Sequence, residues 1–204
     1  MAICMVKSDS VVPLTDRIFH DTQQDVRIAT PRGEKPIETL QPGDRVITRD
    51  NGLQQIRWVG RRRLSGPELQ RAPHLWPVLI RAASLGYGLP ERDMLVSPQH
   101  RLLLSGEREG MVAARYMTAM QEIDQTEYPE MTCIHFMCEH HEMVLLNGIW
   151  IESFRPDEEV PNGVGAAQRA EICEIFPELR AQSGVHTCHV VRHAPQWHEA
   201  RVMR

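Results

Sequence analysis

The fold of this chain is decided by one stretch near its start, RIATPRGEKPIETLQPGDRVITRDNGLQQIRWVGRR, residues 27–62. Two turn signals, Pro31-Arg32-Gly33 and Gln41-Pro42-Gly43-Asp44, interrupt its short apolar pieces, since proline and glycine mark the ends of regular elements. The segments RVITRD and QQIRWVG are typical of strands, and Asp50-Asn51-Gly52 between them is a strong hairpin signal. The stretch therefore predicts short antiparallel strands joined by tight turns.

The next residues continue the same β pattern. Apolar segments bounded by turn residues recur as PVLIRAASL, DMLVS, HRLLLSG, MTCIHFMCE and EMVLLNGIWIESF. The exception is MVAARYMTAMQ, residues 111–121, which favours a short helix. Short strands and turns at this density predict an all-β domain of roughly 135 residues.

The two ends of the chain differ from this domain. Residues 1–20 show no clear period and are expected to form a leader strand or a loose arm. Residues 163–180 place four apolar side chains on one helical face, namely Ile172, Ile175, Phe176 and Leu179. We therefore divide the chain into an N-terminal arm over 1–20, a β domain over 21–159, and a helical appendage with a polar tail over 160–204.

Composition excludes several classes of protein. The net charge of −4 argues against a nucleic-acid partner, since such domains are strongly basic. No segment reaches the roughly 20 apolar residues of a membrane helix, so no membrane partner is expected. The N-terminus has no secretory signal pattern, and five irregularly spaced cysteines favour a reducing compartment. We expect a cytoplasmic protein, although export by an uncleaved or C-terminal signal stays open.

The segment VSPQHRLLL, residues 96–104, raises the question of chemistry. Proline at the second position of Ser97-Pro98-Gln99-His100 favours a type I turn, which holds a hydroxyl and an imidazole close together. Two interpretations stay open at this point: a catalytic pair, or a turn hydroxyl that caps a backbone amide beside a histidine bonded to a carbonyl. No G-x-S-x-G surrounds Ser97, so a hydrolase nucleophile elbow is unsupported.

A second cluster of candidate ligands lies in TCIHFMCEHHE, residues 132–142. Cysteine and histidine are ligands for zinc and copper. On one extended strand, however, Cys133 and His135 share one face while Cys138 and His140 share the other. The strand alone does not bring them to one ion, and the chain contains no C-x-x-C. We expect neither a metal nor a cofactor, and we interpret the histidines of the tail as a solvated polar segment.

Taken in order, these pieces resemble the Hint domain family, which includes hedgehog C-terminal domains, inteins and intein-like bacterial proteins. The blocks that carry the resemblance are residues 27–62, RAASLGYGLPERDMLVSPQHRLLL over 81–104, and HEMVLLNGIWIESF over 141–154. The tail segment AEICEIFPELR, residues 170–180, is also similar to the segment after the domain in the bacterial group. The resemblance implies a horseshoe-like, mostly β domain whose two ends lie side by side.

The resemblance also assigns roles to residues of the site. In the active family, a cysteine at the first residue attacks the preceding carbonyl and forms a thioester. Ser97 and His100 match the T-x-x-H block, in which the histidine protonates the leaving nitrogen and the hydroxyl helps to hold the scissile bond strained. A histidine suits this role because its pKa lies near neutrality. His141 begins the closing block.

The sequence departs from the active pattern in two places. Asp21 stands at the position of the first cysteine, and no cysteine lies between Cys4 and Cys133. A carboxylate forms no thioester, and the hydroxyl of Thr22, one residue out of register, is far less acidic than a thiol. Glu152 and Ser153 occupy the His-Asn positions of inteins, so cyclisation of an asparagine is excluded. We therefore expect a vestigial site formed by His100, Ser97, Asp21 and His141.

These departures leave two functions as alternatives. The first is a Hint domain that does not process itself and acts as a protein- or peptide-interaction module. The second is an autoproteolytic domain that removes its own N-terminal segment with an unusual nucleophile. A structural or metal-associated β protein is a third interpretation. The sequence further predicts that the strand leading to Asn147-Gly148 returns beside residues 26–29, and that Asp21 contacts His100.

Overall fold

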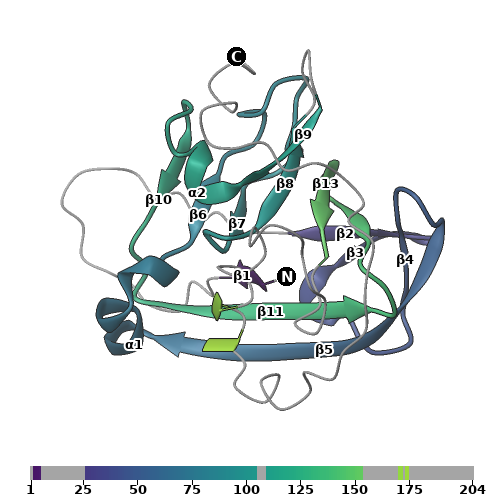
Figure 1. Cartoon of the computed structure of the whole chain (residues 1–204), viewed down its shortest axis with the longest axis horizontal. Helices are drawn as coiled ribbons and strands as arrows, with labels where there is room; N and C mark the ends of the chain where they lie inside the picture. The colour runs from purple at the N-terminus through teal and green to yellow at the C-terminus, as the bar shows by residue number, and fades with distance from the viewer. Residues whose placement is uncertain (1, 6–25, 105–108, 154–169, 172, 175–204) are drawn as a thin grey trace.

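The computed structural model describes residues 2–5, 26–104, 109–153, 170–171 and 173–174, and these residues are mostly β (Figure 1). Their strands form a seven-stranded sheet in the order β10-β6-β7-β1-β11-β5-β4 and a six-stranded sheet in the order β3-β2-β12-β13-β8-β9. An isolated antiparallel bridge between Thr48 and Val144 connects the two sheets. The expected mostly β fold is therefore confirmed.

The seven-stranded sheet is built on a long antiparallel ribbon. Its strands are β1 (Ala2–Met5), β4 (Arg45–Ile47), β5 (Leu53–Ser65), β6 (Val78–Ile80), β7 (Met94–Val96), β10 (Ile123–Gln125) and β11 (Glu130–Cys138). β5 and β11 pair along nearly their full lengths and form the base of the view in Figure 1. The expected hairpin at residues 50–52 is present, because β4 pairs with β5 across it.

The six-stranded sheet brings the two ends of the domain together. Its strands are β2 (Arg27–Thr30), β3 (Gly33–Pro36), β8 (Arg101–Leu104), β9 (Gly110–Ala113), β12 (Met143–Leu146) and β13 (Ile149–Glu152). β12 pairs antiparallel with β2 through Leu146 and Ile28. The strand that leads to Asn147-Gly148 thus returns beside residues 26–29, as the block order predicts.

Two apolar clusters hold these sheets. The main core takes buried residues from both sheets, and its largest fully buried members include Phe136, Ile28 and Ile56. A second cluster, the helix-side cluster, consists of Leu64, Leu69, Leu75, Leu79, Leu95, Met131 and Cys133. Strands β7 and β11 contribute to both clusters, so the seven-stranded sheet is covered on both faces there.

A short helix and a 3-10 turn cover the helix-side cluster. α1 (Gly66–Arg71) begins with a capping box in which the Ser65 amide and hydroxyl both donate to the Glu68 carboxylate. Proline at the start of α1 suits the first helical turn, where no amide partner is lost. α1 supplies Leu69, and η2 (Pro73–Leu75) supplies Leu75 to the cluster.

The helix predicted over residues 111–121 is mostly wrong. Gly110–Ala113 forms strand β9, and only Ala114–Met117 is helical, as α2. Met111 and Val112 pair with Leu103 and Leu102 of β8 and are buried, so cross-strand pairing outweighs local helix propensity. In the part of the chain that the structure describes, no helix is long and apolar enough to span a bilayer.

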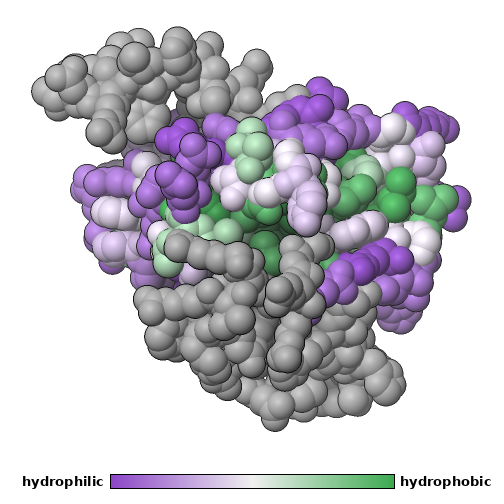
Figure 2. Space-filling model, turned by 90° about the horizontal axis from the view of Figure 1, so that it is seen from above, coloured by the Kyte–Doolittle hydropathy of each residue, from purple (hydrophilic) through white to green (hydrophobic). Residues whose placement is uncertain are grey.

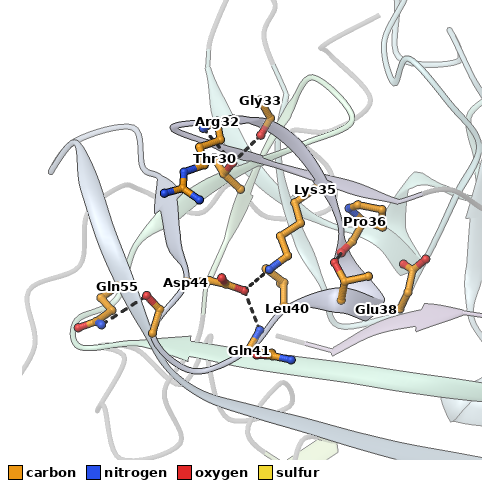
Figure 3. Close-up of polar contacts among 12 residues, drawn as sticks. Thr30, Arg32, Gly33, Lys35, Pro36, Glu38, Leu40, Gln41, Asp44 and Gln55 are labelled. Carbon is orange, nitrogen blue, oxygen red and sulfur yellow. Dashed lines mark hydrogen bonds and ion pairs between the residues drawn. The ribbon is translucent and has the colours of Figure 1, made fainter.

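An ion pair and a hydrogen bond stabilise the Gln41–Asp44 turn of the opening stretch (Figure 3). The Asp44 carboxylate accepts a hydrogen bond from the Gln41 amide at 2.8 Å and pairs with Lys35 Nζ of β3 at 2.5 Å. Burial opposes ionisation of Asp44, but the hydrogen bonds from Lys35 and Gln41 outweigh it and lower the pKa of the carboxyl. Asp44 therefore ties the Gln41–Asp44 turn to β3 and has a structural role.

Large apolar side chains also reach the surface. Among the described residues, Leu53, Tyr87 and Tyr116 are exposed. Figure 2 shows apolar residues gathered near the middle of one face of the molecule, with polar surface above them and at the lower right.

Candidate functional site

The Ser97–His100 turn connects β7 to β8 at the centre of the site. The His100 amide donates to the Ser97 carbonyl at 3.0 Å, which closes the turn that Pro98 predicts. The His100 carbonyl accepts from the Ala114 amide at 2.7 Å. Ser97 is 3% exposed and His100 is fully buried. The turn is therefore packed into the domain, and the side chains of Ser97 and His100 are shielded from bulk water.

The hydroxyl of this turn has a partner from far along the chain. The carboxylate of Glu171 accepts hydrogen bonds from the Ser97 hydroxyl and from the Gln99 amide. Glu171 is 5% exposed, and burial raises the pKa of its carboxyl to about 7, although both hydrogen bonds oppose the shift. The C-terminal segment thus places a carboxyl group on two hydrogen-bond donors of the turn.

Glu174 anchors the same segment at two further points. Its backbone carbonyl accepts a hydrogen bond from Arg62 of β5 at 3.0 Å. Its carboxylate lies 3.1 Å from Nε2 of His74 in η2. These two contacts of Glu174 are exposed to solvent, whereas the contact of Glu171 with the turn is buried. The buried Glu171 contact is therefore the main attachment of this segment to the site.

A buried polar cluster forms around Arg101, the residue that follows His100. The Leu102–Ile151 pairing of β8 with β13 places Arg101 directly opposite Glu152. Arg101 Nη1 lies 3.0 and 3.3 Å from the two carboxylate oxygens of Glu152, and His141 Nε2 lies 3.1 Å from one of them. All three side chains are at most 9% exposed. The cluster therefore joins the closing strand to the residue next to His100.

Ser153 follows Glu152 and is fixed by its own contacts. Its hydroxyl accepts from the Glu142 amide at 2.7 Å, and its amide donates to the Glu142 carbonyl at 2.6 Å. Asn51 donates to both carboxylate oxygens of Glu142, at 3.1 and 3.0 Å. Burial raises the pKa of Glu142, against the hydrogen bond from Asn51 and the charge of His140.

The start of the domain is held by the hairpin turn at Asn147-Gly148. The Asn147 amide donates to the Arg27 carbonyl at 3.0 Å, and the Arg27 amide donates to the Asn147 side-chain oxygen at 2.9 Å. Asn147 and Gly148 have φ angles of 43° and 81°, as a two-residue type I′ turn requires. Asp21 and Thr22 lie outside the described residues, so the expected Asp21–His100 contact stays a prediction.

A family model decides the classification of this chain. The model of the Hint domain matches residues 22–158, which is more than half of the 204 residues. The chain belongs to the Hint domain family. Among curated proteins, none matches the chain at a significant level.

Solved intein structures are also similar to this Hint domain. A DnaB intein from Synechocystis sp. PCC 6803 has 14% identity and a TM-score of 0.39, covering 64% of this chain and 95% of its own. The gp41-1 intein has 15% identity and a TM-score of 0.36, with 62% and 93% covered. The MchDnaB-1 intein has 9% identity and a TM-score of 0.38, with 64% and 97% covered.

The Hint domain brings together three of the four predicted site residues. Ser97 and His100 share one turn, and His141 reaches that region through Glu152 and Arg101. The fourth, Asp21, lies outside the described residues. These contacts place the predicted residues near one another without testing their chemical roles.

Two residues of the site were missed in the sequence. Arg101 follows His100 directly, and the alternation of side chains along a strand predicts that the two residues lie on opposite faces of the sheet. The pairing of Arg101 with Glu152 could not be predicted, because it depends on the partner strand. Glu171 gave no signal, because no local pattern indicates which distant turn a helical carboxylate contacts.

The cysteine- and histidine-containing strand β11 has a packing role. Cys133 belongs to the helix-side cluster and Cys138 to the main core, so the two thiols lie on different faces of the sheet. Burial raises the pKa of the Cys138 thiol to about 12, and the nearby charge of Glu142 adds to the shift. Among the described residues, no group of three or more His, Cys, Asp and Glu side chains is placed to hold a metal ion.

Proposed function

We propose that this Hint domain does not process itself and acts as a protein- or peptide-interaction module. The chemical reason lies at the first position of the domain, where Asp21 stands in place of a cysteine. An acyl shift to a thioester needs a thiolate, and a carboxylate does not supply one. With no thioester, there is no activated acyl group for a second nucleophile to resolve.

The observation that carries the proposal is the buried contact of Glu171 with the Ser97–His100 turn. In an active family member, the hydroxyl of this turn helps to hold the scissile peptide. Here the Ser97 hydroxyl and the Gln99 amide donate to the Glu171 carboxylate. A peptide bond that used these donors would first have to displace a carboxyl group that is 5% exposed.

The closing strand supports the same proposal. Glu152 forms an ion pair with Arg101 and lies 3.1 Å from Nε2 of His141, and Ser153 bonds to the backbone of Glu142. Neither side chain carries the amide nitrogen that asparagine uses in cyclisation. Residues that would complete splicing in an intein here connect strands.

The interaction part of the proposal rests on the N-terminal segment. Residues 2–5 precede the matched region, 22–158, yet they form strand β1 between β7 and β11. The domain thus binds an extended segment from outside its own matched region through backbone pairing. Strand addition of this kind is a general way for a sheet to bind a peptide.

Intact-mass measurement tests whether the domain processes itself. The purified full-length chain is incubated with dithiothreitol at neutral pH, because a thiol releases any thioester that forms. We expect the mass to stay at 23.4 kDa. An N-terminal fragment ending near His20 would overturn the proposal and favour the autoproteolytic alternative.

Two variants show whether Glu171 covers the site. Asp21→Cys supplies a thiol at the first position, and Asp21→Cys with Glu171→Ala also removes the carboxyl group from the turn. We expect the double variant to yield more of the N-terminal fragment than Asp21→Cys alone. Equal yields would remove the observation that carries the proposal, whatever the behaviour of the unmodified chain.

A further inference from the structure

The first strand of the structure divides its larger sheet. β1 lies between β7 and β11 and is antiparallel to both (Figure 1). Without β1, the order would separate into β10-β6-β7 and β11-β5-β4. The edges of β7 and β11 would then face each other with unsatisfied backbone groups, which are costly when buried.

The neighbours of β1 define which residues a strand in this position needs. Ile3 is registered between Val96 and Ile134, which belong to the main core. The next residue, Cys4, is registered between Leu95 and Cys133, which belong to the helix-side cluster.

All four of these neighbours, Val96, Ile134, Leu95 and Cys133, are at most 1% exposed. Successive positions of the incoming strand therefore meet two different apolar clusters on opposite faces of the sheet. A strand that alternates polar and apolar residues would place its polar positions against one of the two clusters, and residues 2–5 of this chain, AICM, contain no polar or charged position of that kind.

We propose that the gap between β7 and β11 is a binding site for an extended apolar peptide, which this chain fills with its own residues 2–5. The site holds the strand through backbone hydrogen bonds on both sides and through apolar neighbours on both faces. A segment of this chemistry binds there whether or not it is covalently joined to the domain. This site locates the peptide interaction that the proposed function includes, and the inference rests on the proposed function only for that interaction.

One consequence concerns any cut between residues 6 and 25. Such a cut leaves β1 attached to its neighbours by the ladder to β11, which extends over all four residues of the strand. The N-terminal fragment is then retained as a noncovalent part of the sheet. A break in the chain before the domain thus does not by itself release the N-terminal fragment.

The experiment cuts the folded full-length chain and asks whether the fragment stays. A Gly/Ser segment with one protease site is inserted between Ser10 and Val11, the protein is cleaved to completion, and the products are separated by native size-exclusion chromatography. We expect the fragment to co-elute with the domain. Release of the fragment would overturn the proposal, whether the remainder stays soluble or precipitates.

A labelled peptide then tests the selectivity of the site. A fluorescent peptide of residues 1–12 is incubated with the cleaved protein until it has exchanged with the retained fragment, and its binding is followed by anisotropy. The matched control peptide carries Ile3→Lys, which puts a charged residue at the strand position registered with Val96 and Ile134. We expect binding of the control to be at least tenfold weaker. Equal binding of both peptides would show that the gap between β7 and β11 is not the site. Neither result depends on self-cleavage, so the mass assay and this one fail separately.

Discussion

Substitution of Glu152 by glutamine is expected to destabilise the domain strongly. The change keeps the size of the side chain and removes its charge, so the guanidinium of Arg101 loses its ionic partner. Arg101 and Glu152 are 7% and 9% exposed in their side chains, and their nearest atoms lie 3.0 Å apart. Removal of one member of a buried pair costs about 3–5 kcal/mol, because the remaining charge stays buried without compensation.

The magnitude is large compared with the stability of a domain. Small proteins unfold with a free energy of about 5–15 kcal/mol, so Glu152→Gln removes a substantial share of it. Replacing both charges, as in Arg101→Met with Glu152→Gln, leaves no buried guanidinium. Because the double variant buries no uncompensated charge, we expect it to be more stable than Glu152→Gln alone.

Urea unfolding followed by circular dichroism measures these differences. The control is Arg57→Met, which removes the ion pair between Arg57 and Glu139. The side chains of these two residues are 54% and 55% exposed, so we expect the control to lower the free energy of unfolding by about 1 kcal/mol or less. If Glu152→Gln cost no more than this control, or if the double variant were less stable than Glu152→Gln, the buried pair would not have the assigned role.

Two further predictions concern the tail contact and the closing hairpin. The pKa of Glu171 is about 7 in the folded chain against an ordinary value of 4.5, so its contribution is complete below the ordinary value and is lost as pH rises through 7. The unfolding free energy of the wild type relative to Glu171→Gln should therefore fall by about 3 kcal/mol between acidic and alkaline pH; a constant difference would contradict this. Gly148→Ala should cost more than Gly52→Ala in thermal unfolding, because a Cβ at Gly148 would lie 2.6 Å from Leu89 while one at Gly52 meets nothing within 4 Å. If both variants lost the same stability, the positive φ angle that both positions share would explain the whole effect, and the contact with Leu89 would have no part in it.

Much of the fold could be predicted because its signals are local. The hairpins at residues 50–52 and 147–148 follow from turn residues between apolar runs, and the Ser97–His100 turn follows from its proline. Residues 111–121 were different, since their helical pattern is local but their strand is decided by pairing with β8. Where a partner strand provides burial on both faces, local propensity does not determine the element.

The candidate site was harder to predict because its contacts join distant segments. His141, Glu152 and Arg101 come from three parts of the chain, and only the register of β8 with β13 brings the last two together. The same applies to Glu171, which is separated from the Ser97 turn by most of the closing half of the domain. Family resemblance named positions at the site, but it did not indicate which charges compensate one another there.

The residues around His100 have folding roles that do not depend on catalysis. The backbone of His100 closes a turn and bonds to Ala114, and Arg101 pairs with Glu152 across two strands. Ser153 connects the closing strand to Glu142. Since the domain is closed by these contacts and by the pairing of β2 with β12, a substitution at the first position changes the chemistry available without removing any of them. The turn and its neighbours are therefore expected to keep their geometry whether or not the domain processes itself, and the same geometry provides the donors that Glu171 of the C-terminal segment binds.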